Sequence, residues 1–245
     1  MDAEELVRSA CPKVGGLGWA FYFTPETLKV GKALGLDGMR FYFLGRGGVL
    51  GDVDAEGVVS AFGYFSPAVV SKMWNSAKEI YPARDAARAY MNCCAELGRA
   101  RFGELTDLAE FCDAAGAVND AADPVGLALY AGIRTQPLTD NLPGRAMQLI
   151  TVLRELRGSA HLLAVLACGL DARTAHYLHR PGDMAAFGWD DADTPVVGDS
   201  ERSKLQAAEE LTDDLVLPAY AVLDDRGQAA LVAGLAAIGK ALGSA

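Results

Sequence analysis

Positive charge is scarce in this 245-residue sequence. It contains 22 lysines and arginines against 32 aspartates and glutamates, which gives a formal net charge of −10 at pH 7. The overall field of such a protein repels phosphate backbones and anionic membrane surfaces, because they carry charge of the same sign. We therefore do not expect nucleic acid or a membrane as a partner, although a local basic patch could override the net charge.

Long apolar runs are absent as well. No apolar stretch reaches the ~18 residues that a membrane-spanning helix requires. The N-terminal sequence MDAEELVRSA is acidic, whereas a secretory signal peptide begins with a positively charged segment. We expect a cytoplasmic protein.

Cysteine motifs for metal binding are missing. The five cysteines show no CxxC spacing, and two adjacent cysteines on a helix point about 100° apart, so a zinc site is not expected. We interpret all five as reduced, buried residues: Cys11, Cys93, Cys94, Cys112 and Cys168.

Familiar phosphate-binding and catalytic motifs are also missing. The glycine-rich segment at residues 45–51 has neither the GxGxxG of a dinucleotide-binding loop nor a P-loop pattern, and GxSxG occurs nowhere in the chain. We interpret this segment as a turn before a helix that begins near Asp54. Arg46 is the residue there that we retain as a candidate for ligand binding.

Apolar residues recur at helical spacing along most of the chain, which predicts roughly ten helices and an all-α, multi-helix globular bundle. Residues 39–43 (MRFYF) are the best strand candidate. Pro12 is expected to close a first helix at residues 3–11, and Pro218 to kink or break a helix at residues 199–223. The other helices are expected at residues 25–34, 66–80, 83–101, 104–115, 123–133, 143–170 and 226–242, with shorter ones after Asp54 and Asp171.

An aromatic segment followed by a helix start occurs twice, as AFYFTP at residues 20–25 and AFGYFSP at residues 61–67. In each, a hydroxyl residue can cap a helix whose first position is proline. This favours two related helical hairpins packed face to face, although chance reuse of a good helix start is the alternative. Residues 1–136 would form an N-terminal half containing the repeat, and residues 137–245 a C-terminal half, together in one compact unit.

The central feature is the helical pattern at residues 143–170, which places charges within apolar sequence. Arg154, Arg157 and His161 follow one another at spacings of three and four, so they share one helix face. Every residue from 160 to 168 except His161 is apolar, which is typical of a buried helix. Because buried charges without partners cost several kcal/mol, Glu155, other acidic residues or a ligand must compensate them.

Our first hypothesis is a small-molecule-binding protein whose pocket takes an acidic, partly hydrophobic metabolite. Arginines can bind a carboxylate or phosphate through paired hydrogen bonds, and aromatic side chains can supply the apolar wall. The alternative is a structural network in which Arg154 and Arg157 pair with Glu155, Glu209 or Asp213 and His161 bonds a backbone carbonyl. The candidate pocket residues are Tyr22, Phe23, Arg46, Tyr64, Phe65, Arg154, Arg157 and His161.

Our second hypothesis is an enzyme in which His161 acts as a general acid or base on an anionic substrate. Acid–base catalysis needs a second positioned group, and the candidates are Glu155, Glu209 and Asp213, with Glu155 named first. No sequence feature identifies a cofactor. His176 and His179 lie three residues apart and could bind a metal with a third ligand from elsewhere, or lie on the surface; HExxH is absent, and we predict no metal site.

Several segments resemble a poorly characterised family, common in actinobacteria, of helix-turn-helix proteins. They include residues 22–36, 41–53, 64–67, 153–170, FGW at 187–189 and EELTD at 209–213. The resemblance implies a winged helix after FGW, yet only 19 residues separate Trp189 from Glu209, where such a unit needs roughly 50. A transcription regulator with a degenerate DNA-binding segment is therefore the third hypothesis. The apolar closing helices are compatible with a homodimer.

Overall fold

The computed structural model describes residues 1–243, and within this range the chain forms twelve α-helices and no strand. The all-α prediction is confirmed. The α-helices are α1 (Ala3–Leu17), α2 (Pro25–Ala33), α3 (Gly38–Gly47), α4 (Ala55–Phe62), α5 (Pro67–Lys78), α6 (Ala83–Arg101), α7 (Leu108–Ala121), α8 (Ala128–Ile133), α9 (Leu142–Ala167), α10 (Ala172–His179), α11 (Asp199–Tyr220) and α12 (Asp225–Leu242). Four 3-10 turns join them: η1 (Gly48–Leu50), η2 (Pro181–Asp183), η3 (Ala185–Phe187) and η4 (Asp191–Asp193).

Side-chain caps fix several helix starts where the sequence predicts them. The hydroxyl of Thr24 accepts a hydrogen bond from the Thr27 amide, and that of Ser66 accepts one from the Val69 amide. Proline follows each cap at a position where its missing N–H costs nothing. The side chain of Asp171 caps α10 by accepting a hydrogen bond from the Thr174 amide.

One strand candidate and one predicted helix end are not found in the structure. Residues 39–43 belong to α3, in which residues 41–44 are all buried; a short apolar run buried on several sides cannot be assigned to helix or strand by its spacing. Pro12 lies inside α1, which continues to Leu17, so it does not close that helix. Pro218 does not break α11, which continues to Tyr220, and a kink at this position stays a prediction. In α1 the lost backbone hydrogen bond is offset because Val14 and Leu17, beyond the proline, are buried in the core.

The two aromatic segments share a helix start but not a packing arrangement. α4 packs against α5 across the second segment, whereas α1 packs against α9, α11 and α12, and α2 packs against α3 and α6. The first copy is therefore not a hairpin, because the apolar face of α1 is covered by C-terminal helices. These contacts also join residues 1–136 to residues 137–245.

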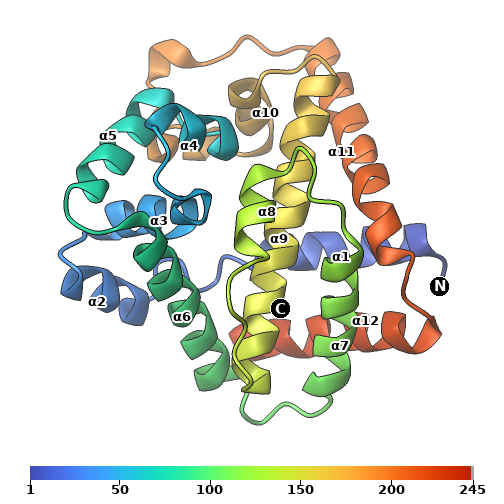
Figure 1. The fold of residues 1–245 in the computed structure, drawn as a ribbon. Helices are drawn as coiled ribbons and strands as arrows, with labels where there is room; N and C mark the ends of the chain where they lie inside the picture. The colour runs from blue at the N-terminus through green and yellow to red at the C-terminus, as the bar shows by residue number, and fades with distance from the viewer. Residues whose placement is uncertain (244–245) are drawn as a thin grey trace.

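Helix α9 passes through the middle of the molecule, with α6, α7, α8 and α11 around it (Figure 1). All of its residues from 146 to 153 are buried. The sequence predicts that the helix is buried on every side after residue 160. Leu163 is 39% and Leu166 57% exposed, so one side of this part of the helix faces solvent. Ala160, His161 and Ala164 do lie inside.

The apolar residues of the closing helix α12 serve the core of the single chain. Leu231, Leu235 and Ile238 are buried against α1 and α7. The homodimer stays a prediction. Within residues 1–243, no helix combines the length and the apolar character needed to cross a bilayer.

The crossing of α6 and α9 provides a test of the fold. A Cβ atom at Gly98 would lie 2.2 Å from the carbonyl oxygen of Pro143, whereas one at Gly116 in α7 would meet nothing within 4 Å. We expect Gly98→Ala to lower the free energy of unfolding by about 1–3 kcal/mol. Gly116→Ala should raise it by about 0.5–1 kcal/mol, because alanine favours a helix interior. Urea denaturation measures both, and equal effects of the two variants would contradict the close approach of α6 to α9.

Candidate functional site

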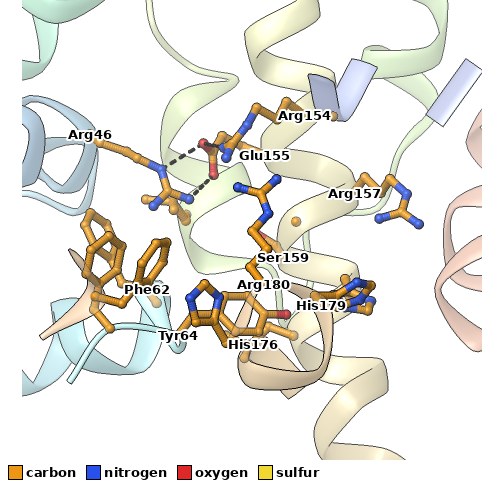
Figure 2. A pocket seen from close by; sticks show the side chains of 18 of the residues that line it. Arg46, Phe62, Tyr64, Arg154, Glu155, Arg157, Ser159, His176, His179 and Arg180 are labelled. Atoms are coloured by element: carbon orange, nitrogen blue, oxygen red, sulfur yellow. Dashed lines mark hydrogen bonds and ion pairs between the residues drawn. The ribbon is translucent and has the colours of Figure 1, made fainter. Parts of the chain in front are cut away.

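A cavity of about 620 Å³ lies beside α9 (Figure 2). Residues of α1, α3, α4, α8, α9, α10 and α11 line it, together with the turn between α4 and α5 and with Phe187 of η3. Arg154, Arg157 and His161 all face this cavity, with side-chain exposures of 24%, 23% and 10%. The helix face predicted from their spacing thus borders a cavity that is partly open to solvent.

Glu155 is the centre of the first ion cluster. Its side chain is 1% exposed, and the guanidinium group of Arg46 donates to it twice, from Nε to Oε1 at 2.9 Å and from Nη2 to Oε2 at 2.8 Å. Nη1 of Arg154 donates to Oε1 at 2.8 Å, and the Tyr22 hydroxyl does so at 3.0 Å. Two cations and one anion therefore meet at this end of the cavity.

Opposing effects set the ionisation of Glu155. Burial alone would raise the pKa of its carboxyl group, but the guanidinium groups of Arg46 and Arg154 outweigh this and hold the pKa at about 2. The two arginines also lie over aromatic rings, Arg46 at 4.5 Å from the centroid of Phe62 and Arg154 at 5.2 Å from that of Tyr22. The carboxylate is ionised at neutral pH and its acceptor positions are largely used.

Glu209 of α11 is the centre of the second ion cluster. Arg157 Nη2 lies 2.7 Å from its Oε2, while His179 Nε2 and His161 Nε2 lie 2.8 and 3.7 Å from its Oε1. The hydrogen bond with His179 lowers the pKa of Glu209 to about 2; burial opposes this shift and Arg157 adds to it. Asp213 is more distant, at 4.0 Å from Arg157.

Hydrogen bonding defines the tautomer of His161. Its Nδ1 lies 2.9 Å from the Thr212 hydroxyl oxygen, and that hydroxyl donates its one hydrogen to the carbonyl oxygen of Ala208 at 2.6 Å. The hydroxyl oxygen must then accept from Nδ1–H of His161, which leaves the lone pair on Nε2. Burial lowers the pKa of His161 to about 4, although the Glu209 carboxylate opposes this, so the ring is neutral at pH 7.

Three buried polar atoms on residues that line the cavity have no hydrogen-bond partner among the described residues. They are the Tyr64 hydroxyl, Nε of Arg157 and Nε2 of His176. Buried polar groups are normally paired, and an unpaired one costs about 1–3 kcal/mol. Each of these atoms has almost no solvent-accessible surface, so a molecule in the cavity would reach it only after a side-chain shift.

The charge of the lining is opposite in sign to that of the whole chain. Four arginines and two glutamates line the cavity, which leaves a net charge of +2 when the histidines are neutral, whereas the whole chain carries −10. Three of these arginines, Arg46, Arg154 and Arg157, are largely buried. Carboxylates just outside the lining partly offset this charge, because Asp183 lies 3.9 Å from Arg180 and Asp213 lies 4.0 Å from Arg157.

The predicted site residues fall into two groups. Arg46, Tyr64, Phe65, Arg154, Glu155, Arg157 and His161 all line the cavity. Tyr22 lies behind it as a buried partner of Glu155, and Phe23 is 46% exposed and stacks on Tyr42 outside it. The ion pairs expected if these residues form only a structural network are also present: Arg154 pairs with Glu155, and Arg157 pairs with Glu209. His161, however, bonds the hydroxyl of Thr212 and not a backbone carbonyl.

The residues that the sequence did not identify as binding residues come mainly from the segment after α9. Phe187 of η3 stacks on Phe65 at 4.1 Å between ring centroids, and it packs in a tilted arrangement against His176 at 3.9 Å. Backbone hydrogen bonding of Ser66 to Phe187 holds this segment against the second aromatic segment. The one available signal was the spacing of His176 and His179, but their partners lie elsewhere in the chain.

The prediction of no metal site considered His176 and His179 as a pair. The structure separates their roles: His179 meets Glu209 and His161, whereas His176 packs against Phe187. The group that could hold an ion is thus His161, His179 and Glu209, contributed by three different helices.

The fold and the cavity together define an all-α protein built on one long central helix, with arginines gathered at an internal site. A family model described as a helix-turn-helix family matches residues 7–245, so the chain belongs to this helix-turn-helix family. The resemblance seen in the sequence is confirmed. No curated protein and no solved structure matches the chain. Residues 190–208, where the resemblance implies a winged helix, contain η4 and the first half of α11.

The buried network around Glu155 predicts a defined pH dependence. Its folded-state pKa lies below the unfolded value, so its stabilising contribution is complete above pH 5 and is lost as pH falls toward 2. We expect Glu155→Gln to lower the free energy of unfolding by about 3–5 kcal/mol at pH 7, because two buried arginines lose their counter-ion. The difference from wild type should narrow by about 2 kcal/mol at pH 3.

Urea denaturation at the two pH values measures this difference. Glu104→Gln is the control, because Glu104 is exposed and has no ion pair among the described residues. A gap between Glu155→Gln and wild type that stays constant from pH 7 to pH 3 would contradict the ionised network.

Proposed function

We propose that this protein binds an acidic, partly hydrophobic small molecule in the cavity beside α9. The observation that carries the proposal is a positively charged lining inside a protein of net charge −10. Within this network Arg46 and Arg154 share a single close carboxylate, Glu155. Two further carboxylates lie only at the limit of ion-pair distance, Asp183 at 3.9 Å from Arg180 and Asp213 at 4.0 Å from Arg157. An anionic ligand would supply the missing charge.

The anionic group of the ligand would bind near Tyr64 and Arg157. The Tyr64 hydroxyl and Nε of Arg157 are donors without a partner among the described residues. Tyr64 also stacks against His161 at 6.3 Å between ring centroids, which places its ring beside the second ion cluster. Hydrogen bonds from such donors to a carboxylate are charge-assisted and correspondingly strong.

The hydrophobic part of the ligand would contact the aromatic wall on the other side. Phe62 and Phe65 lie 6.1 Å apart between ring centroids, and Phe187 stacks on Phe65 at 4.1 Å. All three residues line the cavity. An aromatic wall beside charged groups suits a ligand with an acidic group and an apolar body.

An enzyme that uses His161 is the second candidate, favoured by the Nε2 lone pair of a neutral ring that lines the cavity. Glu155 is a poor partner for proton transfer, because it is held ionised by Arg46 and Arg154. Acid–base chemistry would then depend on His161 and the neighbouring Glu209. We do not propose DNA binding, since residues 190–208 carry two basic residues among five acidic ones.

The test compares decanoate with decanol, which share a chain length and differ in charge. Isothermal titration calorimetry at pH 7 in EDTA should show decanoate binding more than about tenfold tighter than decanol. Tyr64→Phe should weaken decanoate binding about tenfold while leaving the free energy of unfolding unchanged, because the hydroxyl has no protein partner among the described residues.

Tyr90→Phe is the matched control. The Tyr90 hydroxyl is likewise buried without a partner among the described residues, but Tyr90 does not line the cavity. Its loss should change neither affinity nor stability. Equal affinities for decanoate and decanol, or equal effects of the two tyrosine variants, would overturn the proposal.

A further inference from the structure

The geometry points to a binding site for a divalent transition-metal ion formed by His161, His179 and Glu209. One ligand atom of each residue lies within 4.8 Å of the other two. The residues come from α9, α10 and α11, so the three helices converge at this point. Two imidazoles and one carboxylate are a common ligand set for zinc and for non-haem iron.

The distances between the ligand atoms fit a single ion. Three ligands at about 2.0–2.2 Å from a tetrahedral ion lie roughly 3.4 Å from one another. Here Oε1 of Glu209 is 2.8 Å from Nε2 of His179 and 3.7 Å from Nε2 of His161. Shifts of about 0.3–0.6 Å would bring these two separations to that value, and the separation of the two histidine nitrogens is at most 4.8 Å.

Neighbouring groups already orient two of the ligands. Nδ1–H of His161 donates to the Thr212 hydroxyl at 2.9 Å, which leaves the Nε2 lone pair free for an ion. Nη2 of Arg157 binds Oε2 of Glu209 at 2.7 Å and so directs Oε1 toward the two histidines. Oε1 lies 2.8 Å from Nε2 of His179, and an ion would replace this hydrogen bond once Nε2 has lost its proton. Such outer contacts are typical of protein metal sites, where they fix the tautomer and the direction of each ligand.

The remaining coordination positions of the ion would face the cavity, because all three residues line it. Three protein ligands with an open position are characteristic of metal sites that also bind a small molecule. The nitrogen-containing ligand set disfavours Mg²⁺, which prefers oxygen ligands and retains its waters. This inference goes beyond the proposed function and does not require it, since an ion can bind without an organic ligand.

The experiment uses tag-free, full-length protein from which metal has been removed with EDTA followed by dialysis. Titration with Co²⁺ should produce visible absorption that saturates at one equivalent of Co²⁺ per chain. Added Zn²⁺ should displace the Co²⁺ and remove this absorption. Loss of a residue that only supports a metal ligand typically lowers metal affinity 10–100-fold. Because His179 and Glu209 would bind the ion directly, we expect His179→Ala and Glu209→Gln each to lower the affinity for Co²⁺ at least about 100-fold.

His179→Ala keeps the test valid if Glu209→Gln fails to fold, because the His179 side chain is 44% exposed and its loss should leave the fold intact. Glu210→Gln is the matched control for Glu209→Gln: Glu210 is exposed and hydrogen-bonds Gln206, and this variant should bind Co²⁺ as wild type does. The absence of saturable Co²⁺ absorption, or unchanged affinity in His179→Ala, would overturn the inference. Neither result would bear on the proposed small-molecule binding, because decanoate binding is measured in EDTA and thus without a metal ion.

Discussion

The ion pairing of Glu155 is the constraint on which the arrangement of the helices depends. A carboxylate that is almost fully buried on the central helix must be compensated, because an isolated charge there would cost more than the fold can supply. Arg46 of α3 and Tyr22 of the segment after α1 provide this compensation together with Arg154. The hydrogen bonds of Arg46 and Tyr22 with Glu155 each join parts of the chain more than 100 residues apart. One carboxylate therefore fixes α3 and the first aromatic segment against α9. The position of α3 in turn places Arg46 at the edge of the cavity.

The two ends of the cavity differ in chemical character, and the segment after α9 is responsible for the difference. Helix α10 brings His179 to Glu209, while η3 brings Phe187 onto Phe65. Gly188 allows this turn, since it has a φ of +80° and a Cβ atom there would lie 2.2 Å from the side chain of Val69. A polar end beside an aromatic wall suits a molecule with an acidic head and an apolar body. The same segment therefore shapes both the polar and the apolar side of the proposed site.

Features set by neighbouring residues could be predicted from the sequence, and features set by distant contacts could not. The capped start at Thr24 and the common face of Arg154 and His161 follow from spacing alone. The contact between Arg46 and Glu155 could not be predicted in this way, because the two residues lie 109 positions apart and no local pattern specifies which charged residues meet over such a separation. The same holds for His179 with Glu209. Residues 39–43, the best strand candidate, could not be recognised as helical for a related reason: burial on several sides, decided by the tertiary fold, removes the periodicity that identifies a helix.

The contrast between an acidic exterior and buried guanidinium groups has a consequence for kinetics. At physiological ionic strength the Debye length is about 8 Å, so dissolved salt weakens the repulsion between the outer surface and an approaching anion. It weakens the attraction of Arg46 and Arg154 far less, because these groups are enclosed by protein. Added salt should therefore accelerate the entry of an anionic molecule, which is the reverse of the behaviour of proteins whose cationic sites lie on an open surface.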